Sequence, residues 1–468
     1  MTAPHDIIVI GAGSGGLNIA GFMNRAGFNV LLIDKNDTAI GGDCLNFGCV
    51  PSKALIHVAR LARDAQAAER FGITAQGRID FRKVRAYITE KQNRIRQHEN
   101  AAWFRAQGMD VVLGTAQFSG RQRVTVDGKE FQAKRIILAT GSRPRPLTVP
   151  GIEQVRVETN ETIFGLEELP RRLLVVGGGP IGIELGQAFR HLGSEVTIIV
   201  RGKKFLPKES AEIAGVLRTQ LEKEGVRCLF ESEVEAFTGK HQAVVVSRGS
   251  RETVTFDVVL ASIGRVLNTE GLALERAGIA VDSRGKIVVD SYLRTTNKNV
   301  FVCGDIAGAY QFTHAAELHA SIIIGNFFRP RPLWKKVSYD TLSWVTFTSP
   351  EIATWGLSEE QLRKRGTPYE RLVFDFDEDD RAIIDEAQGK LVLYIAKDRV
   401  LGGSMVGEHA GELAQELILA TSAGIPLKAL FEKVYPYPTA SRVNKRAISL
   451  QYAKKLTPFT KRILHWLY

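Results

Sequence analysis

The chain opens on a short apolar run that is typical of a buried parallel strand. Residues 6–10 are followed by a glycine-rich turn, a helical pattern that ends near Ala26, and a second apolar run over residues 30–33. Short apolar runs of this kind favour strands that are covered on both faces. The order of strand, helix and strand predicts a βαβ unit.

The same pattern returns later in the chain. Apolar runs over residues 173–176 and 196–200 again flank a glycine turn and a helical stretch. Between the two copies we expect a long basic helix over residues 81–104, a hairpin that turns at Asp127-Gly128, and a buried strand over residues 135–139. The repeat predicts two Rossmann-like nucleotide-binding folds.

After Trp344 the pattern changes. Residues 372–376 and 391–395 are short runs rich in apolar, β-branched and aromatic residues, which predicts strands of an antiparallel sheet. Helical stretches over residues 412–423 and 440–456 would cover that sheet. The predicted fold class is therefore α/β, with two Rossmann-like domains followed by a separate α+β domain.

Composition adds few constraints. The 468 residues allow about three domains, and 44% hydrophobic with 24% charged residues is ordinary for a globular protein. We find no secretory signal pattern and no apolar stretch long enough to span a membrane, so we expect a cytoplasmic protein. Four cysteines do not make a disulfide scaffold, and Cys228 and Cys303 are expected to be core residues.

The net charge of +11 favours an acidic partner. No nucleic-acid-binding module is recognisable, so nucleic acid is not the partner we expect. Residues 454–468 mix cations with large apolar side chains, and an amphipathic basic helix of this kind either lies on a membrane surface or packs on the protein itself.

The first glycine turn carries the features of a dinucleotide site. Gly11 permits the turn, Gly13 lets the backbone approach a pyrophosphate, and Gly16 lets the helix pack on the strand. The N-terminus of that helix would face the phosphates. Asp34 ends the second strand, at the spacing expected for a carboxylate on a ribose.

The second turn repeats the glycines at Gly177, Gly179 and Gly182 but lacks the acid. Val200 stands in the position that corresponds to Asp34, and Arg201, Lys203 and Lys204 follow it. Cations without a carboxylate suit a ribose 2′-phosphate, which favours NADP and leaves NAD as an alternative. Solvated surface charge is the simpler explanation of the same cations.

Cys44 and Cys49 lie five residues apart in a glycine-rich segment. They would be one helical turn apart if the segment starts a helix, and Pro51 fits a first turn. A cysteine near a helix N-terminus has a lowered pKa, so the pair can cycle between dithiol and disulfide. Zinc is the alternative ligand, but no second Cys or His pair has the spacing to complete a site, and we expect no metal.

With these residues in view, the chain resembles the class I pyridine nucleotide–disulfide oxidoreductases, which include dihydrolipoamide dehydrogenase, glutathione reductase and mercuric reductase. The resemblance covers essentially the whole chain. It is carried by residues 41–53 around the two cysteines, and by four further segments: 139–142, 262–265, 302–305 and 344–350.

The resemblance implies an enzyme with three domains and bound FAD. Residues 1–150 with 271–340 would bind FAD, residues 151–270 would bind NAD(P), and residues 341–468 would form a homodimer. Cys49 would lie against the flavin and Cys44 would face the substrate, while Lys53 and Glu184 would pair near the flavin. The resemblance further assigns cofactor contacts to Thr140, Gly141, Arg265, Asp305 and Thr313, the last at the start of a helix that also contains His314.

One segment departs from the family pattern. The family normally supplies a His–Glu pair from the partner subunit, but here Tyr437 stands in the histidine position and Arg442 in the glutamate position. A phenol, with an ordinary pKa of about 10, is a poor base near neutral pH. Tyrosine here resembles mercuric reductase, although the C-terminal cysteine pair of that enzyme is absent.

Three hypotheses follow for the function. The first is a dihydrolipoamide-dehydrogenase-like enzyme, with its lipoyl group carried by an acidic protein. The second is an NADPH-dependent reductase of a quinone, a metal ion or a small disulfide. The third is a redox-sensing flavoprotein with little turnover.

Overall fold

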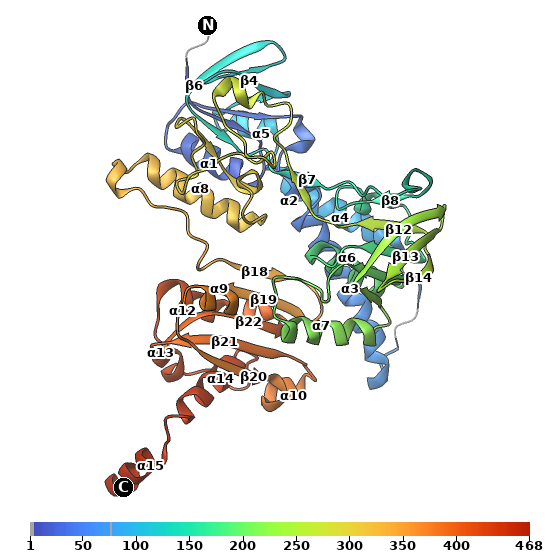
Figure 1. Cartoon of the computed structure of the whole chain (residues 1–468), viewed down its shortest axis with the longest axis vertical. Coiled ribbons are helices and arrows are strands. Elements are labelled where there is room, and N and C mark those ends of the chain that lie inside the picture. The colour runs from blue at the N-terminus through green and yellow to red at the C-terminus, as the bar shows by residue number, and fades with distance from the viewer. Residues whose placement is uncertain (1–3, 75–76) are drawn as a thin grey trace. The chain divides into compact units, whose positions relative to one another are not determined.

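The computed structural model describes residues 4–74 and 77–468, which group into two compact units (Figure 1). The first unit contains Met1–Gly177, His191–Ser194 and Glu233–Val337, and the second contains Gly178–Arg190, Glu195–Ser232 and Ser338–Tyr468. Both units take segments from distant parts of the sequence. The three domain boundaries given above stay predictions.

The first unit begins with the βαβ unit that the sequence predicts: β1 (His5–Ile10), α1 (Ser14–Arg25) and β2 (Val30–Asp34). β1 pairs in parallel with β2 and β6 (Lys129–Leu138). β3 (Asp110–Leu113) extends the sheet beyond β2, and β17 (Val300–Val302) extends it beyond β6. The carboxyl ends of these parallel strands therefore meet at one edge of the sheet.

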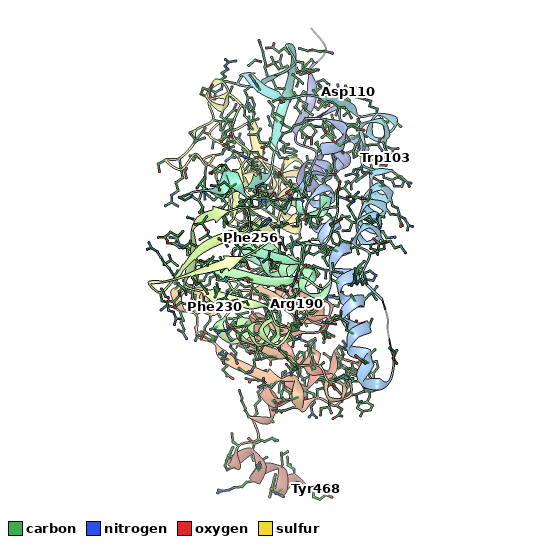
Figure 2. All side chains as sticks on the ribbon, turned by 90° about the vertical axis from the view of Figure 1, so that its right-hand side faces the viewer. Trp103, Asp110, Arg190, Phe230, Phe256 and Tyr468 are labelled. Carbon is green, nitrogen blue, oxygen red and sulfur yellow. The ribbon has the colours of Figure 1, made fainter. Side chains whose placement is uncertain are left out.

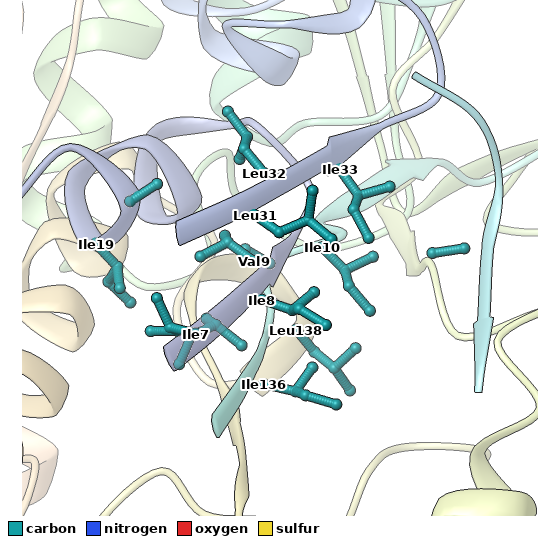
Figure 3. Close-up of a cluster of buried hydrophobic side chains, with 14 of the residues drawn as sticks. Ile7, Ile8, Val9, Ile10, Ile19, Leu31, Leu32, Ile33, Ile136 and Leu138 are labelled. Carbon is teal, nitrogen blue, oxygen red and sulfur yellow. The ribbon is translucent and has the colours of Figure 1, made fainter. Parts of the chain in front are cut away.

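Strands β1, β2 and β17 of this sheet are buried on both faces, which explains their nearly unbroken apolar sequence. Ile7 to Ile10 of β1 are almost completely inaccessible to solvent, and Figure 3 shows them interleaved with side chains of β2 and β6. Cys303, directly after β17, belongs to the same core, as expected. Cys228 is only half-buried.

The expected long helix over residues 81–104 is two helices, α4 (Phe81–Arg96) and α5 (Ala101–Ala106). The prediction was wrong because Asn100 adopts an extended conformation, and its side chain accepts a hydrogen bond of 2.8 Å from the Trp103 amide. Asparagine at this position caps a new helix rather than continuing the old one.

The hairpin prediction is confirmed by β5 (Arg123–Val126) and β6, with β4 (Ala116–Gly120) on the other side of β5. Asp127 and Gly128 have φ angles of 47° and 79°, as a tight two-residue hairpin turn requires.

The remaining strands of the first unit form smaller sheets. Parallel β8 (Val157–Glu158) and β9 (Arg172–Val176) flank β15 (Val258–Ala261). β7 (Ser142–Pro144) pairs with β16 (Arg265–Leu267), and β12 (Ser232–Gly239), β13 (Gln242–Ser247) and β14 (Ser250–Thr255) form a three-stranded sheet. The main helices that complete this unit are α2 (Gly42–Asn46), α3 (Cys49–Ala67) and α8 (Thr313–Phe327).

The second unit contains the parallel pair β10 (Glu195–Val200) and β11 (Arg227–Phe230), with helices α6 (Pro180–His191) and α7 (Ala211–Lys223). It also contains a five-stranded antiparallel sheet, in the order β18-β19-β22-β21-β20. Its strands are β18 (Ser343–Thr346), β19 (Glu351–Gly356), β20 (Glu370–Asp375), β21 (Lys390–Ala396) and β22 (Arg399–Gly407). The antiparallel sheet expected after Trp344 is therefore present.

Short helices surround this sheet: α9 (Glu359–Lys364), α10 (Asp380–Ile384), α11 (Ala410–Leu413), α12 (Gln415–Ala423), α13 (Leu427–Glu432) and α14 (Arg442–Ala453). The last helix, α15 (Pro458–Leu467), is capped by Thr457. Within residues 4–74 and 77–468, no helix combines the length and the apolar character that crossing a membrane would need.

Candidate active site

The first glycine turn has no room for a side chain at Gly11 or Gly16. Gly11 has a φ angle of 104°, and a side chain there would collide with the Ala139 carbonyl. A side chain on Gly16 would collide with the carbonyl of Gly11. A Cβ atom on Gly13, in contrast, would meet only the Cα atom of Gly42, at 3.7 Å. The turn therefore leaves bare backbone where a pyrophosphate would approach.

Asp34 lies against this turn. Its Oδ2 accepts a 2.6 Å hydrogen bond from the Ala12 amide, and its Oδ1 accepts one of the same length from the Lys35 amide. Burial raises the pKa of the carboxyl group, and the two amide hydrogen bonds act in the opposite direction. A partly buried carboxylate at this position fits the ribose contact that the sequence predicts.

Asp305 and Arg265, both expected to contact a cofactor, meet in one polar cluster. The Ser142 hydroxyl donates to Asp305 at 2.5 Å, and the Arg265 Nε atom donates to the Ser142 hydroxyl at 2.7 Å. The same guanidinium lies 3.1 Å from Asp43. Burial raises the pKa of Asp305, against the hydrogen bond from Ser142 and the charge of Arg265.

Sequence reasoning missed Ser142 and Asp43 as members of this cluster. Each adjoins a motif already recognised, since Ser142 follows Thr140-Gly141 and Asp43 precedes Cys44. Their position next to these motifs was the sequence signal that could have indicated both residues. Thr140 itself exchanges two hydrogen bonds of 2.8 Å with Asn268, which fixes the turn at Gly141.

The two cysteines belong to different helices. Cys44 lies within α2, whereas Cys49 is the first residue of α3, and Gly48 separates the two helices. The spacing of one turn within a single helix, considered from the sequence, is not found, because Phe47 (φ −140°) and Gly48 (ψ −113°) leave helical geometry between the two cysteines. Both cysteines are free thiols, and the Cys49 sulfur lies 3.4 Å from the Thr313 hydroxyl.

The neighbouring groups shift the pKa values of the two thiols in opposite directions. A hydrogen bond from Cys44 lowers the pKa of Cys49 to about 6, helped by Thr313 and by the charge of Lys53. The same hydrogen bond, together with burial, raises the pKa of Cys44 well above its usual range. Near neutral pH the reduced pair therefore carries a thiolate on Cys49 and a thiol on Cys44.

Lys53 and Glu184 belong to different units, so their expected ion pair stays a prediction. Lys53 lies on α3, close enough for its charge to act on Cys49. Glu184 lies on α6 with only 6% of its surface exposed, and it accepts a 2.9 Å hydrogen bond from the Phe347 amide. The ring of His314 stacks on Phe312 at 5.2 Å.

The second glycine turn repeats the tight geometry of the first. A side chain on Gly177 would collide with the Ser262 carbonyl, whereas Gly179 faces open space and Gly182 is buried in α6. Val200 ends β10 directly beside this turn, because a Cβ atom on Gly178 would lie 2.8 Å from it. An apolar side chain therefore stands where the first turn has the carboxylate of Asp34.

Only two of the three cations after Val200 extend into solvent. Arg201 and Lys203 are exposed, and the Lys203 ammonium lies 4.0 Å from Glu231. Lys204 instead donates a hydrogen bond to the backbone carbonyl of Glu209. This contact leaves Arg201 and Lys203 as the candidates for a 2′-phosphate.

Tyr437 and Arg442 lie together in the second unit. The guanidinium of Arg442 lies 5.2 Å from the centre of the Tyr437 ring. The phenol is 66% exposed, and its hydroxyl is 3.5 Å from a carboxylate oxygen of Asp380. Across the described ranges, no group of three or more His, Cys, Asp or Glu side chains is arranged to hold a metal ion.

Two tight glycine turns, a buried acid at the first and a polarised cysteine pair in the same unit as that turn define a dinucleotide-dependent redox protein. Residues 5–320 match the family model of the pyridine nucleotide-disulphide oxidoreductases, and residues 342–448 match the dimerisation domain of that family. The chain belongs to the pyridine nucleotide–disulfide oxidoreductase family.

Known proteins support this assignment over nearly the whole chain. A dihydrolipoyl dehydrogenase of Thermus scotoductus is 34% identical over 93% of this chain and 95% of its own. A mercuric reductase of Lysinibacillus sphaericus is 32% identical over 95% of this chain and 82% of its own. The HOCl-induced flavoprotein disulfide reductase RclA of Escherichia coli has a TM-score of 0.84 at 28% identity, over 95% of this chain and all of its own.

The assignment confirms the predicted fold class, with a Rossmann-like FAD-binding region and a C-terminal dimerisation domain. The family depends on FAD and takes electrons from NAD(P)H. The match to the dimerisation domain indicates a homodimer, as in the family. This chain is therefore an oxidoreductase of the pyridine nucleotide–disulfide type.

Proposed function

We propose that the enzyme exchanges electrons between NADPH and a sulfur-containing substrate through Cys44 and Cys49, as a dihydrolipoyl dehydrogenase does. The observation that carries the proposal is the arrangement of the two thiols, because Cys49 begins α3 with its sulfur 3.4 Å from the Thr313 hydroxyl and Cys44 precedes it in α2. Cys49 is stabilised as a thiolate by Cys44 and Thr313, while Cys44 keeps its proton. A pair of this kind is prepared for reversible disulfide chemistry.

The chain supplies groups that would bind FAD and a cysteine pair that would accept its electrons. The backbone at Gly11 and Gly13, with Asp34, would hold the adenosine part of FAD, and Asp305 would hold its ribityl chain. Bound FAD would supply hydride transfer from the nicotinamide and two-electron transfer to the disulfide. Reduction of the Cys44–Cys49 disulfide consumes two electrons and one proton, and it leaves the thiolate on Cys49 and the proton on Cys44.

A second candidate function is reduction of a metal ion, as in the mercuric reductases. The sequence feature in its favour is the pair of Tyr437 and Arg442, which stands where the resemblance implies a base for the proton of Cys44. Transfer of two electrons from the pair to a divalent ion re-forms the disulfide and releases that single proton to solvent. The family relatives include both activities by name, and a Cu(II) complex of RclA is among the similar structures.

The partner and the compartment are part of the proposal. The net charge of +11 suits an acidic lipoyl-carrying protein as the substrate of the first function. A cytoplasmic location is proposed, because a cysteine pair that cycles through the dithiol form needs a supply of reduced nucleotide.

Anaerobic reduction tests the proposal. The purified holoenzyme is titrated with NADPH, and its flavin absorbance and free thiol content are followed. We expect two thiols to appear per chain in the wild type and none beyond background in Cys49→Ser. If both proteins release the same number of thiols, Cys49 is not in the electron path.

Turnover then separates the acceptors. Lipoamide, a small disulfide, a quinone and mercuric ion are offered in turn to the NADPH-reduced enzyme. Lipoamide turnover that is lost in Cys44→Ser supports the first function, and turnover with mercuric ion alone supports the second. Reduction of the cysteines without turnover of any acceptor would favour a redox-sensing protein.

A further inference from the structure

The C-terminal segment differs from the rest of the chain in charge. From Arg442 to Tyr468 the sequence contains no Asp or Glu. It contains seven permanent cations: Arg442, Lys445, Arg446, Lys454, Lys455, Lys461 and Arg462. The segment therefore carries much of the net charge of +11. The family model ends at residue 448, before most of these residues.

Helix α15 has two distinct faces. Phe459, Ile463, Trp466 and Leu467 are spaced so that they fall on one side of an α-helix. Lys461, Arg462 and His465 fall on the other side. In the described part of the chain, none of these seven side chains makes a hydrogen bond or an ion pair with another side chain.

The apolar face of α15 is uncovered. Every residue from Ala453 to Tyr468 is exposed except Thr460, which is half-buried. Phe459 is 71% exposed and Trp466 is 84% exposed. Figure 2 shows α15 with Tyr468 at its end, standing clear of the sheet of its own unit. A contiguous apolar face that is this exposed to solvent marks a site of interaction with a protein or a membrane.

We propose that α15 docks on the surface of an anionic lipid membrane, lying in its plane. The observation is the combination of an uncovered Phe–Ile–Trp–Leu face with an opposite side whose charged residues, Lys461 and Arg462, are all basic. Apolar side chains enter the boundary between headgroups and acyl chains, and Trp466 is of the type that prefers that boundary. Lys461 and Arg462 would then face anionic headgroups, as would the nearby Lys454 and Lys455.

Charge favours a membrane over a second copy of this chain as the occupant. Helix α15 lies beyond residue 448, where the match to the dimerisation domain ends, and residues 442–468 contain no acid, so this segment of a second copy would bring only more positive charge. An anionic lipid surface offers the complementary charge together with an apolar layer beneath it. The inference is independent of the acceptor, since it concerns binding and not turnover.

Vesicle sedimentation tests the proposal with the full-length holoenzyme. Vesicles of equal parts phosphatidylglycerol and phosphatidylcholine are compared with vesicles of phosphatidylcholine alone. We expect binding to the anionic vesicles that is at least roughly tenfold tighter and that weakens as salt is raised. Equal binding to both vesicles, or no binding at low salt, overturns the proposal.

Two double variants probe the two faces. Lys461→Glu with Arg462→Glu should weaken binding by roughly twentyfold or more, at about fivefold for each lost cation. Phe459→Ser with Trp466→Ser should weaken it at least as much. The matched controls are Lys83→Glu with Lys223→Glu, exposed cations on α4 and α7, and Leu333→Ser with Leu419→Ser, both exposed.

Neither control pair should change vesicle binding appreciably, and a loss as large as that of the α15 variants would overturn the proposal. Because the altered residues of α15 are exposed, their replacement should leave flavin content unchanged. Sedimentation velocity of the α15 variants provides the last check. Conversion of the dimer to a monomer would show that α15 packs on a second copy, and the membrane proposal would then fall.

Discussion

The sulfur of Cys49 lies 3.4 Å from the hydroxyl of Thr313, and each of these residues is the first of its helix. Two helix N-termini, from α3 and α8, therefore converge on one sulfur atom. Both helix dipoles favour negative charge there, and the hydroxyl can donate to it directly. This convergence adds to the hydrogen bond from Cys44 in holding Cys49 as a thiolate.

Replacing Thr313 should raise the pKa of Cys49. Thr313→Val removes the hydroxyl donor but keeps the size of the side chain, so we expect the pKa to rise from about 6 by roughly one unit. The pH dependence of alkylation of the reduced enzyme measures the change. Thr313→Ser is the control and should behave as the wild type. An unchanged pH profile in Thr313→Val would show that the hydroxyl does not lower the pKa of Cys49.

Removing Arg265 should destabilise the FAD-binding region. Its side chain is 10% exposed and lies between Asp43 and Asp305, at 3.1 Å and 3.7 Å. Arg265→Met leaves both carboxylates without that cation, and we expect a loss of about 3 kcal/mol in the free energy of unfolding. Urea denaturation measures it. Arg265→Lys keeps the charge and should lose less; equal losses in both variants would show that packing, not charge, is responsible.

The exposed cations after Val200 should set the nucleotide preference. Arg201→Ala with Lys203→Ala should raise the KM for NADPH roughly tenfold and leave the KM for NADH unchanged, because only NADPH carries the 2′-phosphate. Steady-state reduction with each nucleotide gives both constants. Lys204→Ala is the control, because Lys204 donates a hydrogen bond to the Glu209 carbonyl. This replacement should change the KM values for NADPH and NADH alike.

Buried His319 should make the protein less stable in acid. The side chain is 0% exposed, its Nδ1 atom accepts a hydrogen bond from the Gly304 amide, and burial lowers its pKa to about 4. In the unfolded chain the imidazole has a pKa near 6.5, so it binds a proton as the pH falls below 6.5, whereas the buried imidazole of the folded chain stays neutral. Folding stability from this group is therefore present above pH 6.5 and lost towards pH 4, by about 3 kcal/mol.

Urea denaturation between pH 4 and 7 measures this loss. His319→Gln keeps a hydrogen-bond acceptor for Gly304 but does not titrate, so its stability should fall less steeply over the same range. Parallel curves for the two proteins would assign the acid sensitivity to other groups.

Placing a histidine at Tyr437 and a glutamate at Arg442, the pair that the sequence resemblance implies for these positions, should accelerate disulfide exchange. Tyr437→His with Arg442→Glu supplies an imidazole and its carboxylate, and general-base catalysis contributes on the order of a hundredfold or more. We expect an increase of that order in the turnover of lipoamide or a small disulfide. Arg442 begins α14 and lies over the ring of Tyr437, which precedes the helix and is exposed, so the exchange should be tolerated. Unchanged turnover would mean that proton transfer is not the limiting step.

The sequence by itself determined the chemistry-bearing motifs. Glycines at Gly11 and Gly177 are needed wherever the backbone turns this tightly, so the two nucleotide folds could be recognised from their spacing alone. Unbroken apolar runs such as residues 7–10 mark strands that are covered on both faces. The cysteine segment was specific enough to indicate the family to which the chain belongs.

Tertiary structure decided how those motifs act. The sequence does not place Thr313, far along the chain, beside Cys49, nor Ser142 and Asp43 beside Arg265, because such contacts depend on how distant elements pack. The break between α4 and α5 depended on the Asn100 side chain, which caps α5. The spacing of apolar residues does not reveal such a cap. The charge on the Cys44–Cys49 pair likewise follows from burial and neighbours, which exist only in the folded chain.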